Sequence, residues 1–267
     1  FKIFGPPKMS IPDADFMIGL YSSSLVKDDG ELQVGIGSLG DAVIYGLTLR
    51  EKHNDIYNQI LGKTKFKENF SEILEKIGET SPFKIGLFGA TEMMVDGFQE
   101  LYQNNILKKQ VYDHIDLQRL INEKLIDPTK LTTSTIFQLI AKKIINSKLT
   151  KDDYDFLVHW GIFKKDTPFR EGADLQTDQE FIQQNLGHKL KHGHVMHAGF
   201  FLGPSSFYHW LRDLPKDERK LFSMKSVLKI NQLYGHEIID RLHRKNARFI
   251  NTCMMTTLSG AHVSDGI

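Results

Sequence analysis

One stretch of the chain constrains its fold more than any other: residues 83–97, which read FKIGLFGATEMMVDG. The first seven residues form an apolar run with glycine at its end, which predicts a buried strand that stops at a tight turn at Gly89. Glu92 follows among apolar neighbours, where a carboxylate is costly to place unless it has a role. In open α/β sheets, ligands bind beyond the carboxyl ends of the strands. We therefore predict an α/β fold with Glu92 as a candidate site residue; the alternative is an exposed loop glutamate.

A glycine loop precedes this stretch. Residues 31–34 (ELQV) predict a short strand, residues 35–40 read GIGSLG, and a helix is predicted to begin with Asp41 as its N-cap. The loop has the G-x-G-x-x-G spacing of dinucleotide-binding folds, but the next predicted strand begins only near Phe83, whereas that motif requires a βαβ unit of roughly 30 residues. Glycines before a helix N-terminus also favour binding of an anion or a developing oxyanion.

The rest of the pattern predicts an open, mostly parallel sheet flanked by helices, with a large helical insertion. Residues 1–12 contain three prolines and predict a linker, and residues 13–103 form the first part of the α/β domain, with a helical stretch at about 51–81. Residues 104–190 show helical periodicity and predict the insertion. Residues 191–267 form the second part, truncated at its end, with strands at 194–203, 224–230 and 248–260. Cys253, inside the last strand pattern, is predicted to be a core residue.

Composition limits the function. Lys plus Arg number 34 and Asp plus Glu 33, so the net charge of +1 gives no reason to expect a nucleic-acid partner. No apolar run reaches the roughly 18 residues of a membrane helix, and a single cysteine favours a reducing, cytoplasmic location. The histidines at 188, 192, 194 and 197 invite a metal site, but their spacing straddles a loop and a strand and no cysteine or carboxylate joins them, so we predict a core or surface role and no metal site. Because the chain begins at Phe1, we expect it to be a piece of a longer polypeptide.

Three segments, taken in order, resemble the acetyl-CoA hydrolase/CoA-transferase family: LQVGIG at 32–37, ATEMMVDG at 90–97, and RFINT at 248–252 followed by SDG at 264–266. The resemblance spans the chain from about residue 13 and implies the second of two related α/β domains. It implies that Glu92 is the nucleophile and forms a glutamyl-CoA thioester. It also implies that the Ile36 amide forms half of an oxyanion hole, that Gly35 and Gly37 leave room for the thioester, and that Asn251 is an active-site asparagine. Asn251 fits a strand-end cap equally well.

The resemblance thus implies an acetyl-CoA-type CoA-transferase or acyl-CoA hydrolase, with coenzyme A as substrate and product and no permanently bound cofactor. Its partners would be acyl-CoA and a small carboxylate or water, and homo-oligomer formation stays open. Ala90 stands where many members have His or Tyr, so the acyl group is not specified. The family's first domain and its other oxyanion donor fall outside the chain, so we expect this piece alone to be inactive. The alternatives are a nucleotide-binding oxidoreductase domain that uses the glycine loop, and a catalytically degenerate CoA-binding domain.

Overall fold

The computed structural model of the protein describes residue 5 and residues 8–232 and 234–264. The chain divides into two compact units, which are described separately: a sheet unit (residues 1–110, 194–237 and 243–267) and a helical unit (residues 111–193 and 238–242). Pro6 and Pro7 of the predicted linker, and Asp265 and Gly266 of the SDG segment, lie outside the described residues. Among the residues described, no helix has the length and apolar character needed to cross a membrane.

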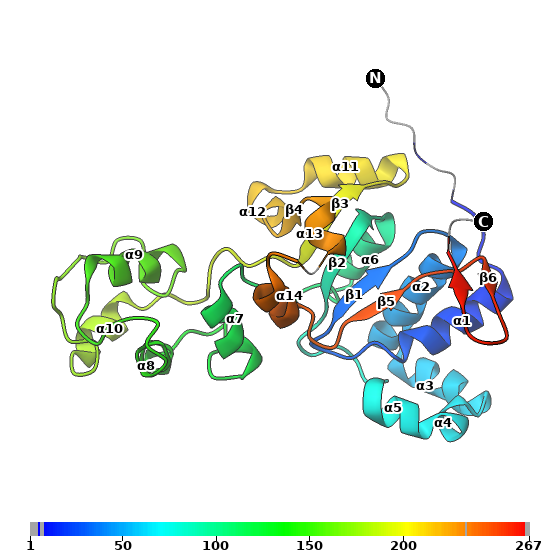
Figure 1. Ribbon diagram of the computed structural model, residues 1–267, viewed down its shortest axis with the longest axis horizontal. Coiled ribbons are helices and arrows are strands. Elements are labelled where there is room, and N and C mark those ends of the chain that lie inside the picture. The colour runs from blue at the N-terminus through cyan, green and yellow to red at the C-terminus, as the bar shows by residue number, and fades with distance from the viewer. Residues whose placement is uncertain (1–4, 6–7, 233, 265–267) are drawn as a thin grey trace. The chain divides into compact units, whose positions relative to one another are not determined.

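The sheet unit is built on five parallel strands in the order β4-β3-β2-β1-β5 (Figure 1). The strands are β1 (Glu31–Val34), β2 (Phe88–Met94), β3 (Met196–Phe201), β4 (Phe222–Met224) and β5 (Arg248–Ile250). The predicted α/β fold with an open parallel sheet is therefore confirmed. The chain runs outward from β1 through β2 and β3 to β4 and then returns to add β5 on the other side of β1. The carboxyl ends of β1 and β5 thus meet where the strand order reverses, which is where open α/β sheets bind ligands.

Helices cover both faces of this sheet. The helices of the sheet unit are α1 (Asp13–Ser23), α2 (Ser38–Lys52), α3 (Asn54–Lys63), α4 (Phe66–Asn69), α5 (Ser71–Ile77), α6 (Asp96–Gln103), α11 (Ser205–Asp213), α12 (Lys216–Arg219) and α13 (Val227–Asn231). The main core lies between the sheet and helices α2, α6 and α11, which bury Leu47, Phe98 and Phe207 against the strands. Met196 and Ala198 of β3 face this core, whereas Gly199 faces α13. Since side chains alternate along a strand, α13 covers the opposite face.

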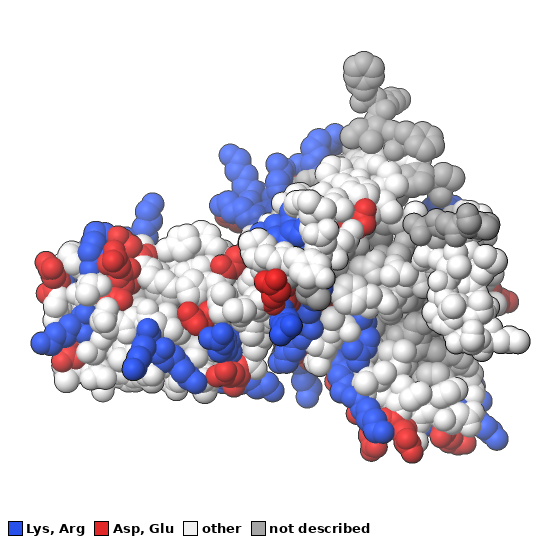
Figure 2. Space-filling model, in the orientation of Figure 1, with Lys and Arg blue, Asp and Glu red and all other residues white. Residues whose placement is uncertain are grey.

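The helical unit contains α7 (Ile115–Asn122), α8 (Thr133–Ala141), α9 (Lys151–His159) and α10 (Gln179–Asn185), while α14 (Glu237–His243) is divided between the two units. Leu117, Leu139, Leu157 and Phe163 lie in a core of its own. Residues 111–193 are all described, and they contain isolated bridges but no named strand. The sequence predicted mostly amphipathic helix over 104–190; these four helices lie in that range, and turns and loops connect them. Lys and Arg side chains are interspersed with Asp and Glu on the face of this unit shown in Figure 2.

The strand that carries Glu92 lies further along the chain than predicted. The sequence indicated a strand at 83–89 and a turn at Gly89, but β2 spans Phe88–Met94, so Glu92 is inside a strand. Residues 84–86 turn around the Asp28 carboxylate, which accepts hydrogen bonds from their three backbone N–H groups at 2.7–3.1 Å. Gly89 serves close packing rather than a turn, because a Cβ atom there would overlap Met196 Sδ.

The last predicted strands are also shorter than expected. The strand predicted at 224–230 ends at Met224, and α13 follows because the Ser226 side chain accepts a hydrogen bond from the Leu228 backbone N–H at 3.3 Å and caps the helix. The strand predicted at 248–260 consists of β5 and then an antiparallel hairpin of β6 (Met255–Thr256) and β7 (His262–Val263). Cys253 was predicted to be a core residue, but it lies between β5 and β6 and is exposed.

Candidate active site

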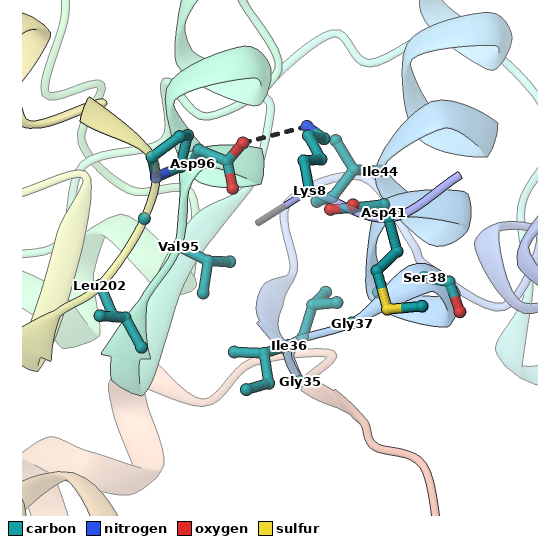
Figure 3. A pocket seen from close by; sticks show the side chains of 15 residues that line it. Lys8, Gly35, Ile36, Gly37, Ser38, Asp41, Ile44, Val95, Asp96 and Leu202 are labelled. Atoms are coloured by element: carbon teal, nitrogen blue, oxygen red, sulfur yellow. Dashed lines mark hydrogen bonds and ion pairs between the residues drawn. The ribbon is translucent and has the colours of Figure 1, made fainter. Parts of the chain in front are cut away.

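The glycine loop spans residues 35–40: residues 35–37 join β1 to α2 at the carboxyl end of the sheet, and residues 38–40 begin α2 (Figure 3). Gly37 has a φ of +102°, which glycine adopts without strain, and it is the N-cap of α2. The prediction of Asp41 as N-cap is therefore wrong, and Asp41 lies in the first turn of the helix. A side chain at Gly40 would collide with the Gly35 carbonyl oxygen, so glycine lets the helix start directly against the loop. The positive end of the α2 dipole consequently lies at the loop.

A pocket of about 210 Å³ opens beside the glycine loop. Its apolar wall includes Ile36, Ile44, Val95 and Leu202, and Figure 3 shows Val95 and Leu202 opposite Ile36. These residues come from the segments that follow β1, β2 and β3 and from α2. Pockets that enclose a whole drug-sized ligand measure about 300–1,000 Å³. This pocket is therefore smaller than such sites and fits a small group.

One end of the pocket carries charge. Lys8 Nζ pairs with Asp96 Oδ2 at 3.0 Å, and Asp41 lies beside this pair (Figure 3). Burial disfavours the charged form of Lys8, but its hydrogen bond and attraction to Asp96 outweigh that effect and raise its pKa. Burial also raises the pKa of the Asp41 carboxyl, against the attraction of Lys8, and the nearby negative charges of Asp96 and Glu100 add to the increase. Two carboxylates against one ammonium make this end of the pocket unfavourable for a further negative charge.

Glu92 lies near the carboxyl end of β2, the middle strand of the sheet, and its side chain is exposed. Gly89 of β2 faces the core that contains Phe98 of α6. Because side chains alternate between the two faces of a strand, Glu92 points toward the opposite face, which α13 covers. There Glu92 Oε2 accepts a hydrogen bond of 2.8 Å from Asn231 Nδ2, at the end of α13. Glu92 is not part of the pocket wall.

Asn251 directly follows β5 and lies against the glycine loop. Its side chain exchanges two hydrogen bonds of 3.0 Å with the amide of Gln33 on β1. A Cβ atom on Gly35 would come within 3.0 Å of Asn251 Oδ1, and the Gly35 N–H donates to the Ile250 carbonyl at 2.9 Å. The Asn251 amide is therefore held over the first glycine of the loop, at the reversal of strand order.

The structure brings part of the predicted site together. Gly35, Ile36 and Gly37 line the pocket, and Asn251 contacts the loop. β1 and β2 are neighbours with Glu31 opposite Phe88, and Gly35 is the counterpart of Glu92 when this register is counted forward. Glu92, however, accepts a hydrogen bond from a residue that the sequence did not single out, Asn231.

Three further residues were missed: Gln33, Lys8 and Asp96. Gln33 had a usable signal, because an amide side chain two residues before the glycine loop lies at the ligand-binding edge of the sheet. Lys8 and Asp96 are 88 positions apart, and no local pattern connects them.

The sequence matches no protein-family model, and comparison with curated proteins finds no match.

Proposed function

We propose that the chain provides the nucleophile-bearing domain of a CoA-transferase or acyl-CoA hydrolase, with Glu92 as the nucleophile. The observation that supports this most directly is Glu92 itself: an exposed carboxylate near the carboxyl end of the middle strand, with its Oε2 held by the Asn231 amide. The glycine loop on the neighbouring strand supplies backbone N–H groups of the kind that stabilise an oxyanion.

In this proposal Glu92 Oε1 attacks the thioester carbonyl carbon of acyl-CoA, and the tetrahedral intermediate collapses by breaking the C–S bond. The products are an acyl-glutamyl anhydride and the CoA thiolate. The thiolate then attacks the Glu92 carboxyl carbon, which forms a glutamyl-CoA thioester and expels the acyl group as a free carboxylate. An acceptor carboxylate runs these steps in reverse to give a new acyl-CoA, whereas attack by water gives net hydrolysis.

The glycine loop and its pocket fit the acyl half of this reaction. The Ile36 N–H would donate to the oxyanion that develops on the acyl oxygen, next to the positive end of the α2 dipole. A pocket of about 210 Å³ with an apolar wall suits a short acyl chain and is too small for coenzyme A or a dinucleotide. The two carboxylates at its end favour an acyl group without a negative charge.

A nucleotide-binding oxidoreductase domain is the second candidate, and one observation favours it: the G-x-G-x-x-G loop does join a parallel strand to a helix. Against it, β2 begins at Phe88 and follows three additional helices, so the compact βαβ unit of the dinucleotide motif is missing from the region between β1 and β2, all of which is described. A degenerate CoA-binding domain is the third candidate, and Glu92 with its hydrogen-bonded amide argues against it.

The test measures CoA exchange by the full-length protein. Acetyl-CoA is incubated with propionate, with other carboxylates and without an acceptor, and the thioesters formed are separated and quantified. We expect propionyl-CoA to appear, or acetyl-CoA to be hydrolysed, at a rate that Glu92→Gln lowers by several orders of magnitude. Saturable NAD(H) binding that no CoA ester displaces, together with no consumption of acetyl-CoA, would favour the oxidoreductase instead.

A further inference from the structure

The pocket beside the glycine loop is partly covered by the segment that precedes α1. Residues 8–12, which we call the strap, belong to no helix or strand, and two of them, Lys8 and Met9, line the pocket. Met9 is 75% exposed and the Lys8 side chain is 55% exposed, whereas Val34 and Ile44 of the inner wall are each 2% exposed. Residues that line a pocket and are still largely exposed lie at its mouth. The strap therefore separates part of the pocket from solvent.

The strap is fixed at one end and held by a single ion pair at the other. At Pro12, the N-cap of α1, it joins a helix that packs closely on α2, because a Cβ atom on Gly19 would overlap the backbone of Ala42. At the other end, Lys8 Nζ pairs with Asp96 Oδ2 at 3.0 Å. Among the contacts between described residues, this pair, which we call the latch, is the one hydrogen bond or ion pair that the strap makes before Pro12.

The latch crosses one end of the pocket. Figure 3 shows Lys8 beside Asp41 of α2 and reaching Asp96 of α6. Burial disfavours the charged form of Lys8, but the hydrogen bond to Asp96 and the attraction of Asp96, Asp41 and Glu100 outweigh that effect and raise its pKa. Lys8 is therefore protonated at neutral pH, and the latch forms there.

The latch is weak enough to open. The Lys8 side chain is more than half exposed, so water and salt screen its attraction to Asp96. Exposed ion pairs of this kind shift an equilibrium by about fivefold or less. The inner wall is different, because Val34 and Ile44 belong to the main core of the sheet unit and cannot move without disrupting it. The strap is thus the part of the pocket that moves most easily.

We propose that the strap is an openable wall that limits the length of the acyl chain in the pocket, with Lys8 and Met9 as specificity-determining residues. This inference rests on the proposed function. While the latch is closed, the pocket of about 210 Å³ accepts a short acyl group. A longer chain has to displace Met9 and separate Lys8 from Asp96 before it fits. The latch therefore disfavours long acyl chains and leaves short ones unaffected.

This role makes chain-length specificity depend on charge. Lys8→Met keeps most of the length of the side chain and removes its ammonium group, so the value of kcat/KM for hexanoyl-CoA relative to acetyl-CoA should rise by about fivefold. Lys8→Glu adds repulsion from Asp96 and Asp41 and should raise this ratio at least as much. Lys8→Arg keeps the positive charge and should keep the wild-type ratio. A residue with a merely structural role would lower turnover of all chain lengths together.

The experiment measures kcat/KM for acetyl-, butyryl- and hexanoyl-CoA in the full-length protein and its variants, at low salt and at about 1 M salt. The Debye length falls from about 10 Å at 0.1 M to about 3 Å at 1 M, so salt should raise the hexanoyl-to-acetyl ratio of the wild type and leave that of Lys8→Met unchanged. Lys63→Glu is the matched control, because Lys63 is exposed on α3 and lines no part of the pocket. This control should have the wild-type ratio at both salt concentrations.

A second measurement follows the strap without relying on activity. The methyl groups of methionine are isotope-labelled, and the signal of Met9 is identified by NMR from its loss in Met9→Leu. We expect this signal to shift in Lys8→Glu, and to move in the same direction when salt is added to the wild type, because both open the latch. Lys63→Glu should leave the signal unchanged.

The two kinds of failure are distinguishable. If the wild type consumes acyl-CoA but neither Lys8→Glu nor salt changes its chain-length ratio, the role of the strap is overturned and the proposed function stands. An unchanged Met9 signal in Lys8→Glu would also overturn it, because the strap would then not open. If the wild type consumes no acyl-CoA of any length, the proposed function is wrong, and the inference about acyl chains is wrong with it.

Discussion

Replacement of Gly199 by alanine tests the contact between α13 and the strand that carries Glu92. The added Cβ atom would lie 2.9 Å from the Glu92 carbonyl oxygen and 2.8 Å from Val227 Cγ2, whereas ordinary contacts begin at 3.4 Å. The two elements must therefore separate by about half an ångström. A misplacement of about 1 Å in an active site costs roughly 10²-fold in rate, so we expect turnover to fall about tenfold. Overpacking lowers the free energy of unfolding by about 1–3 kcal/mol. Alanine offsets about 0.4–1 kcal/mol of this loss, because it reduces the conformational entropy of the unfolded chain.

The assay combines turnover of acetyl-CoA with thermal unfolding. At about 2–4 °C per kcal/mol for a protein of this size, the melting temperature should fall by a few degrees. Gly62→Ala is the matched control, because Gly62 lies in α3 with nothing within 4 Å of its Cβ position, and alanine there should be neutral or stabilising. If Gly199→Ala keeps both turnover and melting temperature, α13 does not pack on β2 and β3 as described.

Three further outcomes follow from single contacts. Asp28→Ala removes the acceptor for the amides of residues 84–86 and should lower the free energy of unfolding by about 2 kcal/mol in urea titrations. Thioesters of short neutral acids should react at least about tenfold faster than those of dicarboxylic acids, equivalent to about 1.4 kcal/mol, and Asp41→Asn should narrow that gap in competition assays. His114 caps α7 by accepting from the Leu117 N–H at 3.3 Å, and burial lowers its pKa against the attraction of Asp116. The unfolded chain therefore binds the proton more readily, so the stabilising contribution of the neutral His114 should be fully present above the ordinary histidine pKa of about 6.5 and should be lost as pH falls below it. His114→Asn, which keeps a capping oxygen, should remove this pH dependence in urea titrations at several pH values.

The sequence predicted the sheet well where local patterns repeat. Short apolar runs before glycines predicted β1 and its neighbouring strands, and apolar residues at helical spacing predicted α2 and α6. These patterns are informative because an element that buries one face repeats apolar residues at its own structural period. It misplaced β2 because the apolar run at 83–89 serves two purposes: a turn around Asp28 and the first residues of the strand. A hydrogen bond to a carboxylate 58 positions away leaves no trace in the local hydrophobic pattern.

The site was predicted in its backbone parts and missed in its side-chain pairs. Glycines at 35 and 37 and the carboxylate at 92 stand out because each is unusual in its local context. Asn231 could not be recognised, since an asparagine at the end of a short polar stretch is an ordinary helix terminus. Asn231 reaches Glu92 because α13, which follows β4, packs on β3 and β2. That contact depends on the order of the strands in the sheet, which the local sequence does not reveal.

The central claim is that Glu92 carries coenzyme A covalently, and trapping of that intermediate tests it most directly. The wild-type full-length protein is incubated with acetyl-CoA, treated with borohydride and digested, and the peptide that contains Glu92 is analysed by mass spectrometry. We expect reduction of this one side chain to an alcohol, dependent on acetyl-CoA. The Glu92→Gln variant should show no modification, and its turnover should be lower by about 10³ or more. An unmodified peptide together with a glutamine variant that keeps its turnover would contradict the account, and Glu92 would then be an exposed carboxylate with no covalent role.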